Sequence, residues 1–115
     1  MTANSVLKVA RAHLKDVGTP FRWTTPTLMP FLDIAQRTVG TRRPDALIAE
    51  AGTLITLTDI SGGTANTNID LSEKWIDPLA HAVAGHAFMT DARDRTDEAR
   101  STKHFMLFES SVKQA

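Results

Sequence analysis

Apolar residues recur at intervals of three and four along much of the chain, which is the spacing of one helical face. The pattern is clearest after Pro26, where one face carries Leu28, Phe31, Leu32, Ala35 and Val39. Thr24 or Thr25 is expected to precede this helix as its N-cap, and Gly40 to end it. The sequence therefore predicts a helix over about 26–40.

The same spacing predicts three further helices, over about 5–17, 78–91 and 97–112. Asn4 or Ser5 is expected to cap the first of them. Its charged residues are expected to face outward: Lys8, Arg11 and Lys15. The helix over 78–91 is rich in alanine and glycine, so it is thin and another helix can pack close to it. Its small residues are Ala80, Ala82, Ala84, Gly85 and Ala87.

Between the second and third helices the apolar period changes to two. Residues 53–58 and 68–71 alternate as strands do, and the glycine-rich stretch 61–64 separates them. We therefore predict a β-hairpin over about 53–71, which must lie against the helices or a neighbouring copy because a lone hairpin is marginal in water. The expected fold class is mainly α, a four-helix α-α-ββ-α-α arrangement in a single domain, 1–115.

Composition narrows the possible functions. The chain has 115 residues, of which 42% are hydrophobic, enough for one modest core. Thirteen basic and thirteen acidic side chains cancel, so no strong overall attraction to nucleic acid or anionic lipid is expected. The lack of cysteine excludes disulfides and thiol chemistry. No signal peptide or bilayer-spanning run is recognised, so we expect synthesis in the cytoplasm.

No group of residues in the sequence has the spacing of a catalytic, cofactor or metal site. His81 and His86 are five residues apart, which places them about 140° apart around a helix instead of on one face. His13, alone in its helix, is interpreted as a half-buried packing residue. The charged run at 91–100 is interpreted as a solvated connection between helices. We therefore predict no enzyme activity, no cofactor and no metal.

Arg37, Arg42 and Arg43 form the one concentration of basic residues in the sequence, with Arg22 nearby. Two interpretations are open. Cations at the end of a helix complement its dipole. Alternatively, the arginines and the aromatic loop at 21–23 form a weak, salt-sensitive surface for nucleic acid.

Several short motifs occur in a recognisable order along the chain. They are Pro20-Phe21-Arg22-Trp23-Thr24, Leu28, Phe31-Leu32-Asp33, Ala35-Gln36-Arg37, Arg43-Pro44-Asp45-Ala46 and the run from Ala99 to Phe108, ARSTKHFMLF. In this order they resemble the small head–tail connector, or adaptor, proteins of tailed bacteriophages. The similarity covers nearly the whole chain, although Pro30 and the stretch 38–40 depart from the pattern.

The resemblance implies a structural virion protein at the head–tail interface. Its copies are expected to form a dodecameric ring beneath the portal protein, and the tail or the next connector protein docks on that ring. Genomic DNA would pass through the channel without specific binding. A head-to-tail interface between copies closes into such a ring when its rotation divides the circle. The residues predicted to contact partners lie at the hairpin tip and in the C-terminal segment: Gly62, Gly63, Phe105, Phe108, Val112 and Lys113.

Overall fold

The structure, a computed structural model, describes residues 1–15, 23–49, 52–90 and 95–114, without the side chains of 95–98. In these ranges the α-helices are α1 (Ala3–Leu14), α2 (Thr25–Arg42), α3 (Ile76–Thr90) and α4 (Arg95–Gln114). Two short 3₁₀-helices, η1 (Pro44–Leu47) and η2 (Glu73–Trp75), follow α2 and precede α3. Three features of the sequence predictions lie outside the described residues: the helix end at 16–18, Phe21 with Arg22, and the connection at 91–94.

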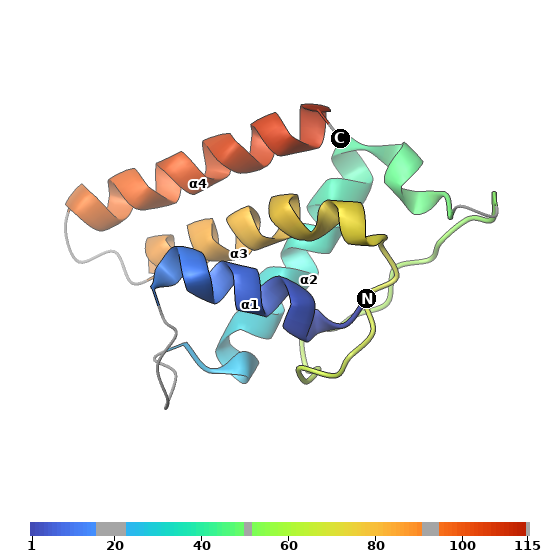
Figure 1. Ribbon diagram of the computed structural model, residues 1–115, viewed down its shortest axis with the longest axis horizontal. Helices are drawn as coiled ribbons and strands as arrows, with labels where there is room; N and C mark the ends of the chain where they lie inside the picture. The colour runs from blue at the N-terminus through green and yellow to red at the C-terminus, as the bar shows by residue number, and fades with distance from the viewer. Residues whose placement is uncertain (16–22, 50–51, 91–94, 115) are drawn as a thin grey trace.

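Helix α3 lies at the centre of the molecule, and α1, α2 and α4 each pack against it (Figure 1). Its small side chains make this possible. Ala80, Ala84 and Ala87 are fully buried. At Gly85 an added Cβ would lie 3.1 Å from the ring of Phe105, so the glycine allows α4 to approach closely. One helix rich in small side chains therefore serves as the common packing surface for the other three.

Helix α1 begins at Ala3, ahead of the two residues predicted to cap it. The N–H groups of Ala3 and Asn4 donate to the carbonyls of Thr67 and Ala65, at 2.8 and 2.9 Å. These bonds satisfy amides that a helix N-terminus leaves unpaired. A segment remote in sequence thus takes the role that a capping side chain was expected to play.

The prediction that Arg11 faces outward is wrong. Arg11 is only 5% exposed. The guanidinium donates from Nε and Nη2 to the carbonyl of Trp23, at 3.2 and 3.1 Å, and from Nη2 to Oγ1 of Thr25 at 3.1 Å. Because these acceptors lie where α2 begins, Arg11 holds α1 against the start of α2.

Helix α2 continues past Gly40, the predicted helix end, so that prediction is also wrong. Gly40 is buried, and an added Cβ would lie 3.3 Å from Leu47 and 3.4 Å from Leu57. Its missing side chain serves close packing instead of a left-handed cap. The helix ends before Arg43, next to the proline that begins η1.

The predicted β-hairpin over 53–71 is wrong, and so is the α-α-ββ-α-α fold class. The described residues are mainly helical and contain no β-strand, only isolated bridges. The two halves of the alternating stretch pair with different neighbours. The N–H of Ile55 donates to Leu47 at 2.6 Å, whereas the N–H of Ile69 donates to Met1 at 2.8 Å. The halves therefore never pair with each other.

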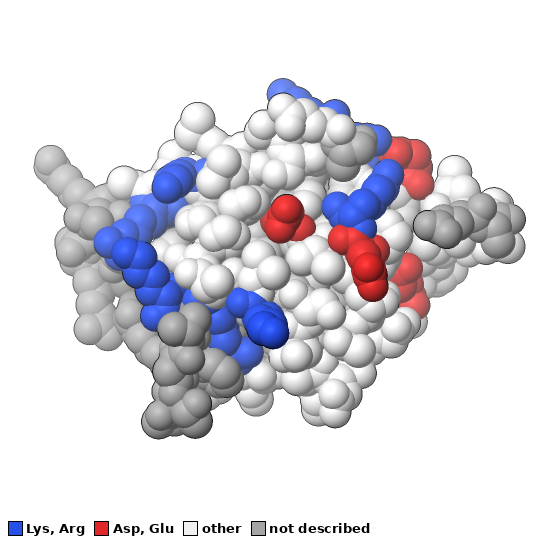
Figure 2. All heavy atoms as spheres, viewed as in Figure 1, with Lys and Arg blue, Asp and Glu red and all other residues white. Residues whose placement is uncertain are grey.

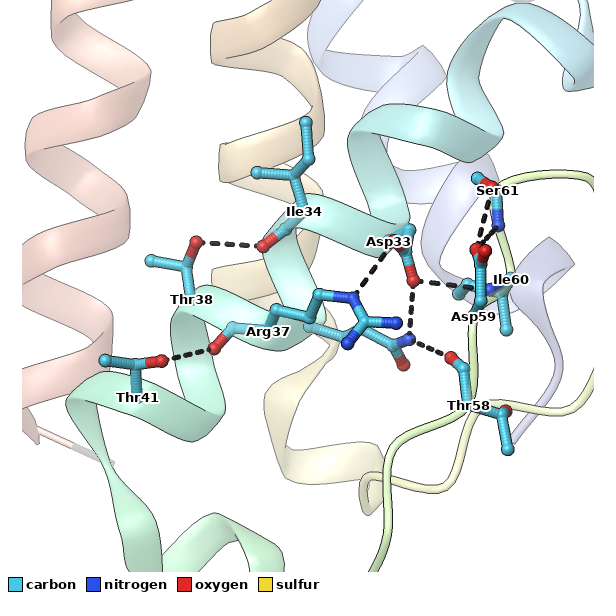
Figure 3. A network of polar contacts seen from close by, with 10 residues as sticks. Asp33, Ile34, Arg37, Thr38, Thr41, Thr58, Asp59, Ile60 and Ser61 are labelled. Carbon is cyan, nitrogen blue, oxygen red and sulfur yellow. Dashed lines mark hydrogen bonds and ion pairs between the residues drawn. The ribbon is translucent and has the colours of Figure 1, made fainter.

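Polar side chains of α2 explain part of this outcome, because they bind the extended connection directly (Figure 3). Gln36 Nε2 donates to the carbonyl of Thr58 at 2.7 Å, and Asp33 Oδ1 accepts the N–H of Ile60 at 3.2 Å. Gln36 Nε2 also donates to Asp33 Oδ1 at 3.1 Å. Backbone groups that a partner strand would have used are thus already paired. We call Asp33, Gln36 and residues 58–60 the α2 network.

Candidate functional site

The arginines proposed as a basic patch are each paired with an acid. The partners are Asp33 for Arg37, Glu109 for Arg42 and Asp45 for Arg43. Arg43 also donates to the carbonyl of Val112 at 2.6 Å, which ties η1 to the end of α4. Its hydrogen bonds to Asp45 lower the pKa of that carboxyl. These contacts assign the three arginines to joining elements of the fold.

A different group of cations lies at the other end of the molecule, where Figure 2 shows basic side chains gathered over α1 and the beginning of α4. Lys8, Lys15, Arg100 and Lys103 are exposed there. Three of them, Lys15, Arg100 and Lys103, line a cavity of about 200 Å³. The sequence analysis did not single out this group, because its members come from helices far apart in the chain.

Some of the residues predicted to contact partners are buried in the structure, and others are accessible. Phe108 and Val112 are each 3% exposed and belong to the core of the subunit. Phe105 and Lys113 line a shallow groove of about 540 Å³ along α4. Gly62 is exposed, whereas an added Cβ at Gly63 would lie 2.5 Å from Thr67 Oγ1. Only part of the predicted set is therefore accessible in the single subunit.

Large apolar side chains are exposed at several places on the described residues, among them Ile34 on α2 and Met89 on α3. Two further places are of interest. One is the arm, residues 48–49 and 52–57, which follows η1 (Figure 1); its residue Leu54 is 78% exposed and Ile48 55% exposed. The other is α4, where Met106 is 67% exposed beside the groove. Met106 lies in the C-terminal segment 105–115, which was predicted to face partners, although it was not one of the named residues. Leu54 was not predicted to contact a partner.

Three histidines from three helices meet inside the molecule. They are His13 of α1, His81 of α3 and His104 of α4, and one ring nitrogen from each lies within 4.8 Å of the other two. We call them the histidine cluster. The Nδ1 atoms of His81 and His104 are 3.1 Å apart, and the ring of His13 stacks on that of His81 at 4.5 Å between centroids.

The surroundings of His81 and His104 disfavour the charged forms of these two rings. Phe88 stacks on His104, with 5.5 Å between ring centroids. Burial lowers the pKa of His104 to about 4, with a smaller contribution from His13, and burial also lowers the pKa of His81. Both imidazoles are therefore neutral at pH 7, and each has one nitrogen with a lone pair.

No local pattern in the sequence indicates this cluster. The histidine pair weighed there, His81 and His86, points in two directions: His86 packs between Phe31 and Phe105, at 5.7 and 5.0 Å between ring centroids. The true neighbours of His81 come from α1 and α4. Only the packing of both helices on α3 brings them together, so no local spacing could have indicated the group.

Within the described part of the chain, no helix has the length and apolar character needed to cross a membrane. The described residues offer two kinds of candidate site. The first is the pair of apolar surfaces, on the arm and on α4, and the second is the histidine cluster. No protein-family model, curated protein sequence or solved structure matches the chain.

Proposed function

We propose that this chain is a structural subunit of the head–tail connector of a tailed bacteriophage, and that identical copies form a ring beneath the portal protein. The observation that carries the proposal is the presence of two different exposed apolar surfaces, the arm and the α4 groove. When one surface of a subunit binds a different surface of the next, the contact is head-to-tail and can close into a ring.

The arm of one copy is a suitable occupant for the α4 groove of the next. Leu54 and Ile48 expose apolar side chains on a projecting segment, and Met106 and Phe105 line the groove. Burying such side chains is favourable by about 25 cal/mol for each square ångström of apolar surface. A contact of this kind would give each subunit one donor and one acceptor surface.

The roles of the motif residues also support the proposal. Trp23 supplies the carbonyl that Arg11 binds, Gln36 holds the extended connection, and Arg43 joins η1 to α4. The residues that carry the resemblance to connector proteins thus determine how the elements are joined. Such residues are expected in a family defined by shape and assembly.

The alternative, a nucleic-acid-binding module, has less support. It depends on Arg37, Arg42 and Arg43, and each of these guanidiniums pairs with a carboxylate. DNA phosphates would have to displace those carboxylates. A steep dependence of DNA binding on salt concentration, lost on replacing the three arginines, would favour this alternative.

Mass spectrometry and cryo-electron microscopy of purified phage particles test the proposal. The chain should be present in particles of the phage that encodes it, and density at the head–tail vertex should fit it as a closed ring. Its absence from purified particles would overturn the proposal.

A matched pair of variants tests the surfaces. Met106→Lys should weaken ring assembly at least about tenfold, because it puts a charge in the apolar contact. Met89→Lys changes a residue that is also exposed, at 58%, but lies on α3, and it should assemble as the wild type does. Light scattering on mixtures with the portal protein measures both. Equal assembly by the two variants would remove the α4 groove from the proposal.

A further inference from the structure

We propose that His13, His81 and His104 bind one Zn²⁺ ion, with the fourth coordination position open to water or a small anion. This inference is independent of the proposed connector function, since it depends only on how α1, α3 and α4 pack. It assigns a ligand to a cluster that the connector proposal does not use.

The distances between the rings are close to those of a zinc site. Zinc binds histidine nitrogens at about 2.0–2.1 Å in a tetrahedron, which places two ligand nitrogens about 3.3 Å apart. The Nδ1 atoms of His81 and His104 are 3.1 Å apart. All three ligand nitrogens lie within 4.8 Å of one another. The ring of His13 stacks on that of His81, so it has to turn out of this stack to complete the triangle.

The facing nitrogens of His81 and His104 fit a metal as well as they fit a hydrogen bond. Without metal, one Nδ1 must carry a hydrogen that it donates to the other. With metal, both present lone pairs to the ion. The neutral imidazole is the form that binds metal.

The cavity beside the cluster leaves one coordination position open, although the cations that line it oppose the approach of a divalent ion. The cavity of about 200 Å³ is lined by His13 and His104, so solvent can reach the place of a fourth ligand. Lys15, Arg100 and Lys103 line the same cavity and favour hydroxide or another small anion there. Imidazole ligands suit Zn²⁺ and other late transition metals, whereas Mg²⁺ and Ca²⁺ prefer oxygen.

Calorimetric titration of the full, untagged chain with ZnCl₂, after removal of metals with a chelator, tests the proposal. We expect one ion per chain and no heat of binding with MgCl₂ or CaCl₂. Each of His13→Gln, His81→Gln and His104→Gln should weaken zinc binding at least about tenfold, because each removes one of three ligands. His86→Gln is the matched control, since His86 lies on α3 outside the cluster, and it should bind zinc as the wild type does.

Nuclear magnetic resonance of the wild-type imidazoles provides a readout that does not depend on the folding of variants. One equivalent of zinc should shift the ring nitrogen signals of His13, His81 and His104 and leave those of His86 in place. Absence of binding at about 100 μM zinc would overturn the proposal. Equal weakening by His86→Gln, or shifts centred on His86, would also overturn it, because either would indicate adventitious binding to a histidine outside the cluster.

Discussion

Two groups of polar residues are partly buried in this small protein, and they differ in how completely their members are paired. In the α2 network, the side chains of Asp33 and Gln36 bind specific backbone groups of residues 58–60 at 2.7 to 3.2 Å. In the histidine cluster, the described hydrogen bond joins two members of the cluster itself, His81 and His104. The cluster also borders a cavity lined by cations.

This difference distinguishes a group that stabilises the fold from a group that can bind a ligand. Buried polar groups need hydrogen-bond partners. When all the donors and acceptors of a network belong to the folded chain, the network contributes to the stability of the fold. A cluster in which two ring nitrogens bond to each other beside a cavity can exchange that hydrogen bond for an added ligand. We therefore expect the α2 network to control stability, and the histidine cluster to matter little for stability in the absence of metal.

Replacing Gln36 should produce the largest loss. Gln36→Leu keeps a side chain of similar size at a position that is 1% exposed, but leaves the carbonyl of Thr58 without its donor. The expected cost is about 2–3 kcal/mol in the free energy of unfolding, because a buried side chain loses two hydrogen bonds, one to the carbonyl of Thr58 and one to the carboxylate of Asp33. Urea unfolding followed by circular dichroism measures it.

The control for Gln36 is the next residue of the same helix. Arg37 bonds to the same carboxylate, that of Asp33, but its side chain is 51% exposed. Arg37→Ala should therefore cost less than about 0.5 kcal/mol, as exposed ion pairs usually do. If the two variants lose the same stability, the α2 network does not hold the extended connection.

Replacing Arg11 should have the next largest effect. Arg11→Met keeps the apolar part of the side chain and removes the guanidinium that binds the carbonyl of Trp23 and Oγ1 of Thr25. We expect a loss of about 2 kcal/mol, since a charged donor to a buried carbonyl is removed. Lys8→Met, an exposed position of the same helix, should change the unfolding free energy by less than about 0.5 kcal/mol. Equal effects would contradict the role assigned to Arg11.

The helices were largely predictable because their signals are local. The spacing of Leu28, Leu32, Ala35 and Val39 marks the buried face of α2, and all four are buried. The β-hairpin predicted from the alternating stretch at 53–71 was wrong for a physical reason. Alternation indicates which side chains can face a core, but it does not indicate which backbone groups will pair. Here Gln36 and the N-terminus provided the partners.

The features that the sequence missed arise from tertiary packing. Arg11 lies four residues after Leu7, on the buried face of α1, and that spacing was the available hint. The histidine cluster had no such hint. His13, His81 and His104 come from three helices, and their meeting depends on how closely α1 and α4 approach the thin α3. Helix positions can be predicted from local patterns, whereas a site built by three helices cannot.

Acidification should destabilise the metal-free chain by a smaller amount. Burial lowers the pKa of His104 to about 4 and lowers the pKa of His81 and His86. In the unfolded chain a histidine has a pKa near 6.5, so between about pH 6.5 and 4 the unfolded state binds more protons than the folded state. Stability is therefore full above pH 6.5 and falls as the pH drops through this window.

We expect this loss to be about 1–2 kcal/mol, after allowance for screening by the solvent that still reaches the rings. Urea unfolding at fixed ionic strength, with a chelator present, measures it from pH 7.5 to pH 4.5. His104→Phe should make the decline shallower, because it removes the ring with the largest shift. An equally steep decline in this variant would show that other groups cause it.

The smallest effect is expected for His104→Phe itself at pH 7.5 without metal. Phenylalanine is similar in size and can keep the stacking contact with Phe88, while the hydrogen bond to His81 is lost. Because the stacking contact is kept and only one hydrogen bond is lost, the unfolding free energy should change by less than about 1 kcal/mol. A small loss here, beside the large loss for Gln36→Leu, would show that one interior polar group holds the fold and the other is available to bind. A loss above about 3 kcal/mol would instead make the histidine cluster part of the structural core, and the distinction between the two groups would fail.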